Sequence, residues 1–183
     1  MNKEKFVTDL ARKAVEEYIV SGNETEVDET ELPDILKKKA GVFVTLKKEG
    51  KLRGCMGTFR PVQKNAAYEI ISNAMTAAEN DPRFPEVKEE ELNQIKISVD
   101  ILSEPEPVSD KSELDPKKYG ILVKGGHQTG LLLPDLEGVE TADKQLNIAK
   151  RKAGLGEDAE VEIYRFTVSR FEENEWSISC TIL

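Results

Sequence analysis

The 183-residue sequence has two cysteines, one histidine and only 6% aromatic residues. Cys55 and Cys180 are too few for a disulfide framework, so we interpret both as reduced thiols and expect no bond between them. With His127 as the one histidine, a closed zinc site would need both cysteines and a carboxylate from distant segments. We therefore expect neither a metal nor an organic cofactor. No Gly-x-Ser-x-Gly or Gly-x-x-x-x-Gly-Lys-Ser/Thr motif occurs, which argues against α/β-hydrolase and P-loop chemistry.

Long hydrophobic runs are missing as well. Apolar stretches such as 121–123 and 131–133 fall far short of the ~20 residues that a membrane span needs. Residues 1–6 have no apolar segment typical of a signal peptide, so we expect a cytoplasmic location and no membrane contact. The net charge of −9 repels phosphate backbones, and non-specific binding of nucleic acid is not expected.

The patterns that are present alternate between helical and extended periodicity. Apolar residues recur at helical spacing over 3–20, from 62 to about 80, and over 141–153. Extended patterns predict strands over 42–46, 52–58, 95–102, 120–124, 130–133, 160–171 and 175–182. These elements predict an α+β fold in which a largely antiparallel sheet is covered by helices.

The second helical pattern is the best defined. Pro61 suits a first helical position, and the Asn80-Asp81-Pro82 sequence ends the helix. Its spacing predicts a buried face and an exposed face, the first with Ala66, Ile70, Ala74 and Met75 and the second with Glu69 and Asn73.

The residues best suited to binding or catalysis are concentrated in the stretch Leu52-Arg53-Gly54-Cys55-Met56-Gly57-Thr58-Phe59. The glycines allow a close approach of the backbone, which together with Arg53 and a following helix could hold a carboxylate or phosphate. Arg53 and the helix end, if close to Cys55, would favour the nucleophilic thiolate. The alternative is a strand with a bulge, in which the glycines serve packing and Cys55 is a small buried hydrophobe.

Two neighbouring features bear on this stretch. Residues 47–64 hold six basic residues against one acid, a positive segment in an acidic chain. The sequence Asp81-Pro82-Arg83-Phe84-Pro85 fixes an arginine beside an aromatic ring between two prolines. Either Arg83 and Phe84 face a ligand, or Phe84 fills the core while Arg83 pairs with an acid.

The stretches 52–59, 81–85 and Gly130-Leu131-Leu132-Leu133-Pro134 resemble the successive signatures of the AMMECR-one (AMMECR1) domain family, whose prokaryotic members are called AmmeMemoRadiSam system protein A. The resemblance covers essentially the whole chain. It implies a main domain with a smaller subdomain, and an association with a Memo-like protein and a radical S-adenosylmethionine enzyme. Met56 replaces the more usual isoleucine.

Two functional hypotheses follow. The protein either binds a small anionic substrate or a partner near the Arg-Gly-Cys motif, or is an enzyme that uses Cys55 as a nucleophile or redox thiol. The candidate ligand-binding residues are Arg53, Gly54, Gly57, Thr58, Asp81, Arg83 and Phe84. If Arg53 is an exposed anion-binding side chain, Arg53→Ala should weaken binding and leave the fold intact.

Overall fold

The computed structural model describes residues 3–173, which divide into two compact units. The first contains the chain up to Ile101 and again from Arg170, and the second contains Leu102–Ser169. No helix among the described residues is both long enough and apolar enough to cross a membrane.

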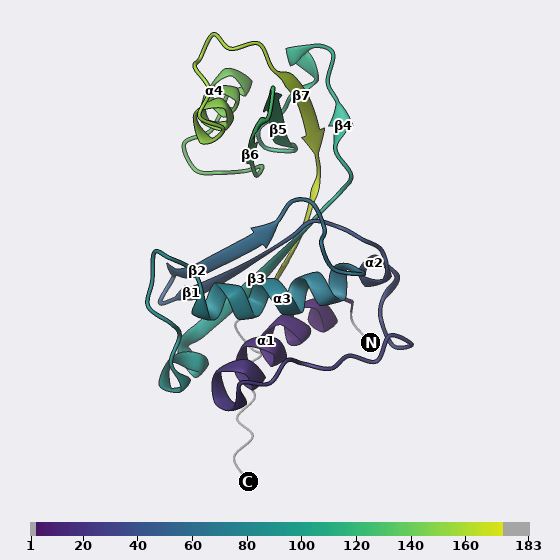
Figure 1. Ribbon diagram of the computed structural model, residues 1–183, viewed down its shortest axis with the longest axis vertical. Helices are drawn as coiled ribbons and strands as arrows, with labels where there is room; N and C mark the ends of the chain where they lie inside the picture. Colours follow the sequence, from purple (N-terminus) through teal and green to yellow (C-terminus); the bar gives the residue numbers. More distant parts are fainter. Residues whose placement is uncertain (1–2, 174–183) are drawn as a thin grey trace. The chain divides into compact units, whose positions relative to one another are not determined.

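The first unit is a four-stranded sheet with its helices on one face (Figure 1). The strands lie in the order β2-β1-β3-β8, and β1 is antiparallel to both β2 and β3. Their bounds are β1 Val42–Lys48, β2 Lys51–Thr58, β3 Ile95–Leu102 and β8 Val168–Glu172. The helices are α1 Lys3–Ser21, α2 Asp34–Lys37, α3 Ala66–Glu79 and the 3-10 helix η1 Glu89–Gln94.

Alternation along the strands separates the two faces of this sheet. Val42, Val44 and Leu46 of β1 are fully buried and belong to one core with α1 and α3. Because neighbouring strand residues point to opposite faces, Phe43 and Thr45 lie on the face that carries none of α1, α2 and α3. We call this surface the helix-free face.

The start of α3 and the burial of its polar residues correct the sequence-based prediction. The helix begins at Ala66 rather than near Pro61, because Asn65 caps it by accepting the backbone N–H of Tyr68. Ala66, Ile70 and Ala74 are buried as predicted, whereas Met75 is only partly buried. Glu69 and Asn73, predicted to be exposed, are buried, because each has hydrogen-bond partners inside the unit.

The second unit is a smaller antiparallel sheet with one α-helix, α4, and one short 3-10 helix, η2, among the described residues. Its strands lie in the order β4-β7-β5-β6, and α4 packs on β5 and β6. The elements are β4 Glu106–Pro107, η2 Lys111–Glu113, β5 Gly120–Gly125, β6 Gln128–Leu132, α4 Ala142–Lys152 and β7 Glu162–Phe166.

Most of the predicted elements of this unit are present. The hairpin turns at Gly126, whose φ of 60° suits glycine, and at the exposed His127. The predicted strand 160–171 is two strands, β7 and β8, because the chain leaves one sheet and enters the other. The predicted strand 175–182 and Cys180 lie outside the described residues. The α+β class with an antiparallel sheet in each unit is confirmed.

Candidate functional site

The strand that carries Cys55 has a bulge at Arg53. Leu46 pairs with Gly54, but the next residue of β1, Lys47, pairs with Leu52, so Arg53 is an extra residue in β2. A bulge of this kind bends the strand and redirects one side chain. The bulged-strand interpretation of the backbone is therefore confirmed.

The Arg53 side chain is held by a segment that follows α3. Its Nη1 donates to the carbonyl of Pro85 at 2.9 Å, and Nη2 donates to the carbonyl of Glu86 at 3.0 Å. Nε and Nη2 also bind the two carboxylate oxygens of Glu91, at 3.2 and 2.8 Å. Only 12% of the Arg53 side chain is exposed. All three guanidinium nitrogens are thus used inside the protein.

Glu91 is the centre of this cluster. Its Oε1 accepts a bond from Lys48 at 2.9 Å, and its Oε2 accepts the backbone N–H of Lys88 at 3.2 Å. Hydrogen bonding to Arg53, followed by that to Lys48, lowers the pKa of Glu91 to about 2. The carboxylate is therefore ionised at neutral pH and fastens η1 to the β1–β2 hairpin.

Asp81 and Arg83 bind the backbone of Cys55. The Asp81 carboxylate accepts the N–H of Cys55 at 2.8 Å, and Arg83 Nη2 donates to the Cys55 carbonyl at 3.1 Å. The two side chains bind each other through Nε–Oδ1 and Nη2–Oδ2 contacts of 2.9 and 2.7 Å. Hydrogen bonding to Arg83 is the main reason that the pKa of Asp81 lies well below its usual range.

The exposure of these two residues differs sharply. The Asp81 side chain is 2% exposed, whereas 54% of the Arg83 side chain is exposed. Arg83 also lies beside the ring of Phe84, with its guanidinium carbon 5.6 Å from the ring centre. Phe84 is only partly buried. Arg83 therefore pairs with an acid, as the second alternative predicts, and also reaches solvent, whereas Phe84 is not part of the hydrophobic core of the first unit.

The thiol of Cys55 lies on the helix-free face. The hydroxyl of Thr45, directly opposite on β1, donates to Cys55 Sγ at 3.2 Å. Ser98 of β3 is the next residue in this cross-strand row, and all three residues are partly exposed. In the neighbouring row Asp100 forms two hydrogen bonds with Arg170, of 2.7 and 2.9 Å. The face thus presents a thiol and two hydroxyls.

The glycines on either side of Cys55 serve packing. A Cβ on Gly54 would lie closer than 3.0 Å to the backbone carbonyl of Ala77 in α3. On the other face, a Cβ on Gly57 would lie closer than 3.0 Å to the ring of Phe43. Real Cβ atoms do not make such contacts, so both positions need glycine for close approach.

The structure separates the predicted site residues into two groups. Arg53, Cys55, Asp81 and Arg83 meet along the outer edge of β2, and Phe84 lies beside Arg83. Gly54 and Thr58 instead face α3, where the Thr58 hydroxyl donates to the buried carboxylate of Glu69.

Sequence reasoning missed three residues of this region: Thr45, Glu69 and Glu91. The alternation of β1 with buried Val44 and Leu46 could have placed Thr45 on the same face as Cys55, once the hairpin register was known. Glu91 carries no local signal, since it lies 38 positions from Arg53.

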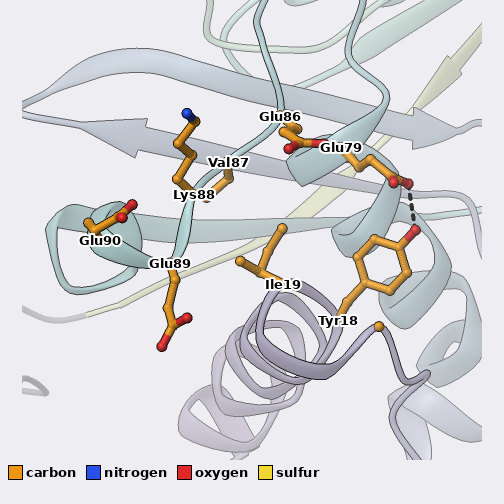
Figure 2. Close-up of a pocket in the computed structure, with 9 residues that line it drawn as sticks. Tyr18, Ile19, Glu79, Glu86, Val87, Lys88, Glu89 and Glu90 are labelled. Atoms are coloured by element: carbon orange, nitrogen blue, oxygen red, sulfur yellow. Dashed lines mark hydrogen bonds between the residues drawn. The ribbon is translucent and has the colours of Figure 1, made fainter.

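A separate hollow of about 520 Å³ lies between the C-terminal ends of α1 and α3 and residues 86–90 (Figure 2). In it the hydroxyl of Tyr18 donates to Glu79 at 2.5 Å. Its other charged lining residues are Glu86, Lys88, Glu89 and Glu90. Because this lining is mostly acidic, the hollow repels the anionic groups that the Arg83 region would attract.

The sequence pattern of the AMMECR1 family matches residues 8–171. This match spans both units and includes the whole β2 edge. The chain belongs to the AMMECR1 family.

Relatives agree with this AMMECR1 assignment. A protein of Thermotoga maritima is 55% identical over 88% of this chain and 94% of its own length. A Clostridium acetobutylicum protein is 48% identical over 90% of this chain, which spans only 35% of that longer protein. In structure, the chain is similar to the uncharacterized protein PH0010 of Pyrococcus horikoshii, with a TM-score of 0.85 and 34% identity, covering 94% of this chain and 92% of that one.

Proposed function

We propose that this AMMECR1 protein is a binding component that holds an anionic group of a small substrate or partner with Arg83, next to Cys55. One observation carries the proposal. Arg83 is fixed by Asp81 and by the Cys55 carbonyl, yet its Nη1 has no hydrogen-bond partner among residues 3–173. A fixed guanidinium with free N–H groups is suited to binding carboxylate or phosphate.

Arg53 has a different role in this proposal. Its donors are already used by Glu91 and by the carbonyls of Pro85 and Glu86, so a ligand would have to displace them. It therefore acts as a positioning residue, which anchors the segment after Arg83 to β2. This replaces the expectation that Arg53 itself binds the anion.

The charges set the expected affinity. Asp81 offsets the charge of Arg83, while Lys48 and Arg53 exceed Glu91 by one positive charge. A lone anion should then bind with a Kd on the order of 1 mM. Tighter binding would require further contacts, for which the helix-free face offers the hydroxyls of Thr45 and Ser98.

The partners in this proposal are a Memo-like protein and a radical S-adenosylmethionine enzyme, as the family resemblance implies. The Clostridium relative supports a role as a component, because in that protein the matched region is joined to a much longer chain. Covalent attachment raises the effective concentration of one module for another.

The alternative function is an enzyme that uses the Cys55 thiol as a nucleophile or redox group. The bond from Thr45 to Sγ favours this alternative, because a hydroxyl at 3.2 Å fixes the position of the sulfur on the helix-free face. Partial exposure of Cys55 also leaves the thiol within reach of a reagent.

Titration with inorganic phosphate, followed by NMR shifts of backbone amides, tests the binding proposal. We expect saturable shifts at Cys55 and Arg83 in the wild type and their loss in Arg83→Gln. The control Arg151→Gln on α4 should show the same shifts as the wild type. Equal shifts in Arg83→Gln and the wild type would contradict the proposal.

The alternative is tested in a Cys180→Ser background, where iodoacetamide reports on Cys55 alone. Alkylation at neutral pH at least about tenfold faster than that of a free thiol would support the enzyme. A rate no higher than that of a free thiol would count against it, and Cys55→Ser should leave phosphate binding unchanged under the binding proposal.

A further inference from the structure

The segment between β2 and α3, residues 59–65, has an unusual anchor. The carboxylate of Glu69 accepts the backbone N–H groups of Val62 and Gln63, at 3.0 and 2.8 Å. It also accepts the hydroxyl of Thr58. Glu69 itself is 0% exposed. A fully buried carboxylate thus fixes the backbone of a surface segment from beneath.

Burying the Glu69 carboxylate to hold this segment carries a desolvation free energy. Removing a carboxylate from water is unfavourable unless donors replace the water, and here two backbone N–H groups and one hydroxyl do so. Asn73 extends the network by donating to Thr58 Oγ1 at 3.2 Å and to the carbonyl of Val42 at 3.1 Å. These hydrogen bonds restrict the conformations that the segment can adopt.

The segment presents an apolar side chain between basic ones. Val62 is 72% exposed, more than the two other exposed large hydrophobic residues in the described part of the chain, Val20 and Leu52. Arg60 and Lys64 are exposed on either side of it.

A second basic segment lies alongside the first. The N–H of Ala66 donates to the carbonyl of Lys38 at 2.8 Å, and a Cβ on Gly41 would meet the carbonyl of Phe59. Residues 38–41 therefore run beside both ends of residues 59–66, close to the contact of α2 with α3 (Figure 1). Lys38 and Lys39 are both exposed. We call Lys38, Lys39, Arg60, Val62 and Lys64 the basic loop patch.

Three of the four cations in the basic loop patch have no carboxylate partner among residues 3–173. These are Lys38, Lys39 and Arg60, whereas Lys64 pairs with Glu29. Positive charge that no carboxylate of residues 3–173 neutralises is notable in a protein of net charge −9. Together with the exposed Val62, it forms a surface that is complementary to carboxylates around an apolar side chain.

We propose that the basic loop patch docks an acidic segment of a partner protein, with an apolar side chain of the partner against Val62. This surface is distinct from the Arg83 site and does not depend on it. The net charge of −9 disfavours binding of nucleic acid, because the densely negative phosphate backbone repels the acidic protein as a whole. One exposed valine is too little apolar surface for membrane insertion.

Fluorescence polarisation with a short labelled polyglutamate peptide that has one central leucine tests the proposal. We expect saturable binding that weakens with salt, and a loss of about tenfold in Arg60→Glu. Val62→Ser should weaken binding about fivefold, and should remove the preference for this peptide over one with serine in place of leucine. Val20→Ser and Lys152→Glu, on other exposed positions, serve as matched controls.

Three results would overturn the proposal. The first is equal binding by Val62→Ser and the wild type. The second is a loss of peptide affinity in the controls Val20→Ser and Lys152→Glu as large as that in Val62→Ser and Arg60→Glu. The third is tighter binding of a single-stranded oligonucleotide, or of vesicles containing phosphatidylserine, than of the leucine peptide.

The anchor has its own test. In Glu69→Gln the amide hydrogens of Val62 and Gln63 should exchange faster, and the leucine peptide should bind more weakly although no exposed residue has changed. Unchanged exchange and unchanged affinity in a folded Glu69→Gln protein would contradict the role of Glu69. If this variant does not fold, the two surface variants still decide the docking proposal.

Discussion

Arg53 and Glu91, 38 positions apart in the sequence, form a two-bonded ion pair of 2.8 and 3.2 Å in the first unit. The pair joins the bulge of β2 to η1, and the same guanidinium binds two backbone carbonyls. Stability, rather than ligand binding alone, is therefore expected to depend on Arg53.

The substitution Arg53→Ala should lower the free energy of unfolding by about 2–4 kcal/mol, because it leaves Glu91 and two carbonyls without their main donor. This reverses the sequence-based expectation of an intact fold, which assumed an exposed arginine. Urea denaturation measures the change. The exposed Arg151→Ala should cost less than about 0.5 kcal/mol, and a similarly small loss in Arg53→Ala would contradict the structure.

Stability should also depend on pH through Glu91. Its pKa falls from 4.5 to about 2 on folding, so folding favours the ionised carboxylate. The resulting stabilisation is fully present above about pH 4.5 and is lost as the pH falls towards about 2. The difference in unfolding free energy between the wild type and Glu91→Gln should be constant from pH 7 to about 4.5 and then shrink. A difference that grows on acidification would have the wrong sign.

Gly54 should tolerate no side chain. In Gly54→Ala the new methyl group would overlap the Ala77 carbonyl, and this backbone atom cannot move without displacing α3. We expect a loss of about 2 kcal/mol or more, measured by thermal or urea unfolding. Gly156→Ala is the matched control, since its Cβ would meet nothing within 4 Å. Equal melting curves for the two variants would show that β2 and α3 are not in contact.

The core side of α3 provides a fourth prediction. Ile70 is fully buried, so Ile70→Ala should cost about 2–5 kcal/mol in denaturant unfolding. Val20→Ala, at a residue that is 58% exposed, should change stability by less than about 0.5 kcal/mol. A loss below about 0.5 kcal/mol for Ile70→Ala would mean that this face is solvated.

The elements with a regular pattern could be predicted from the sequence. The apolar spacing of α1, α3 and α4 and the alternation of β1 and β3 correspond to the observed elements, because burial of one face sets these periods. The start of α3 was placed too early because Val62 fits the helical period. Instead Asn65 caps the helix by accepting the N–H of Tyr68, and Glu69 accepts the N–H of Val62 outside the helix.

The site was predictable only in part. The sequence marks Arg53, Cys55 and Arg83 through their glycine and proline neighbours, and it leaves open the pairing of Arg83 with an acid, which in the structure is Asp81. Whether a given arginine is free or occupied depends on residues far along the chain. The role of Arg53 therefore depends on its ion pair with Glu91, and no spacing rule indicates such a distant partner.

The binding of Asp81 and Arg83 to the Cys55 backbone also bears on aggregation. β2 is an edge strand, and an edge with unpaired backbone groups can recruit a strand from another molecule. The Asp81 carboxylate and the Arg83 guanidinium already bind the N–H and carbonyl of Cys55, as a neighbouring strand would. A second chain would have to break this ion pair before it could extend the sheet. The two side chains therefore help to keep the protein from polymerising through its own sheet edge.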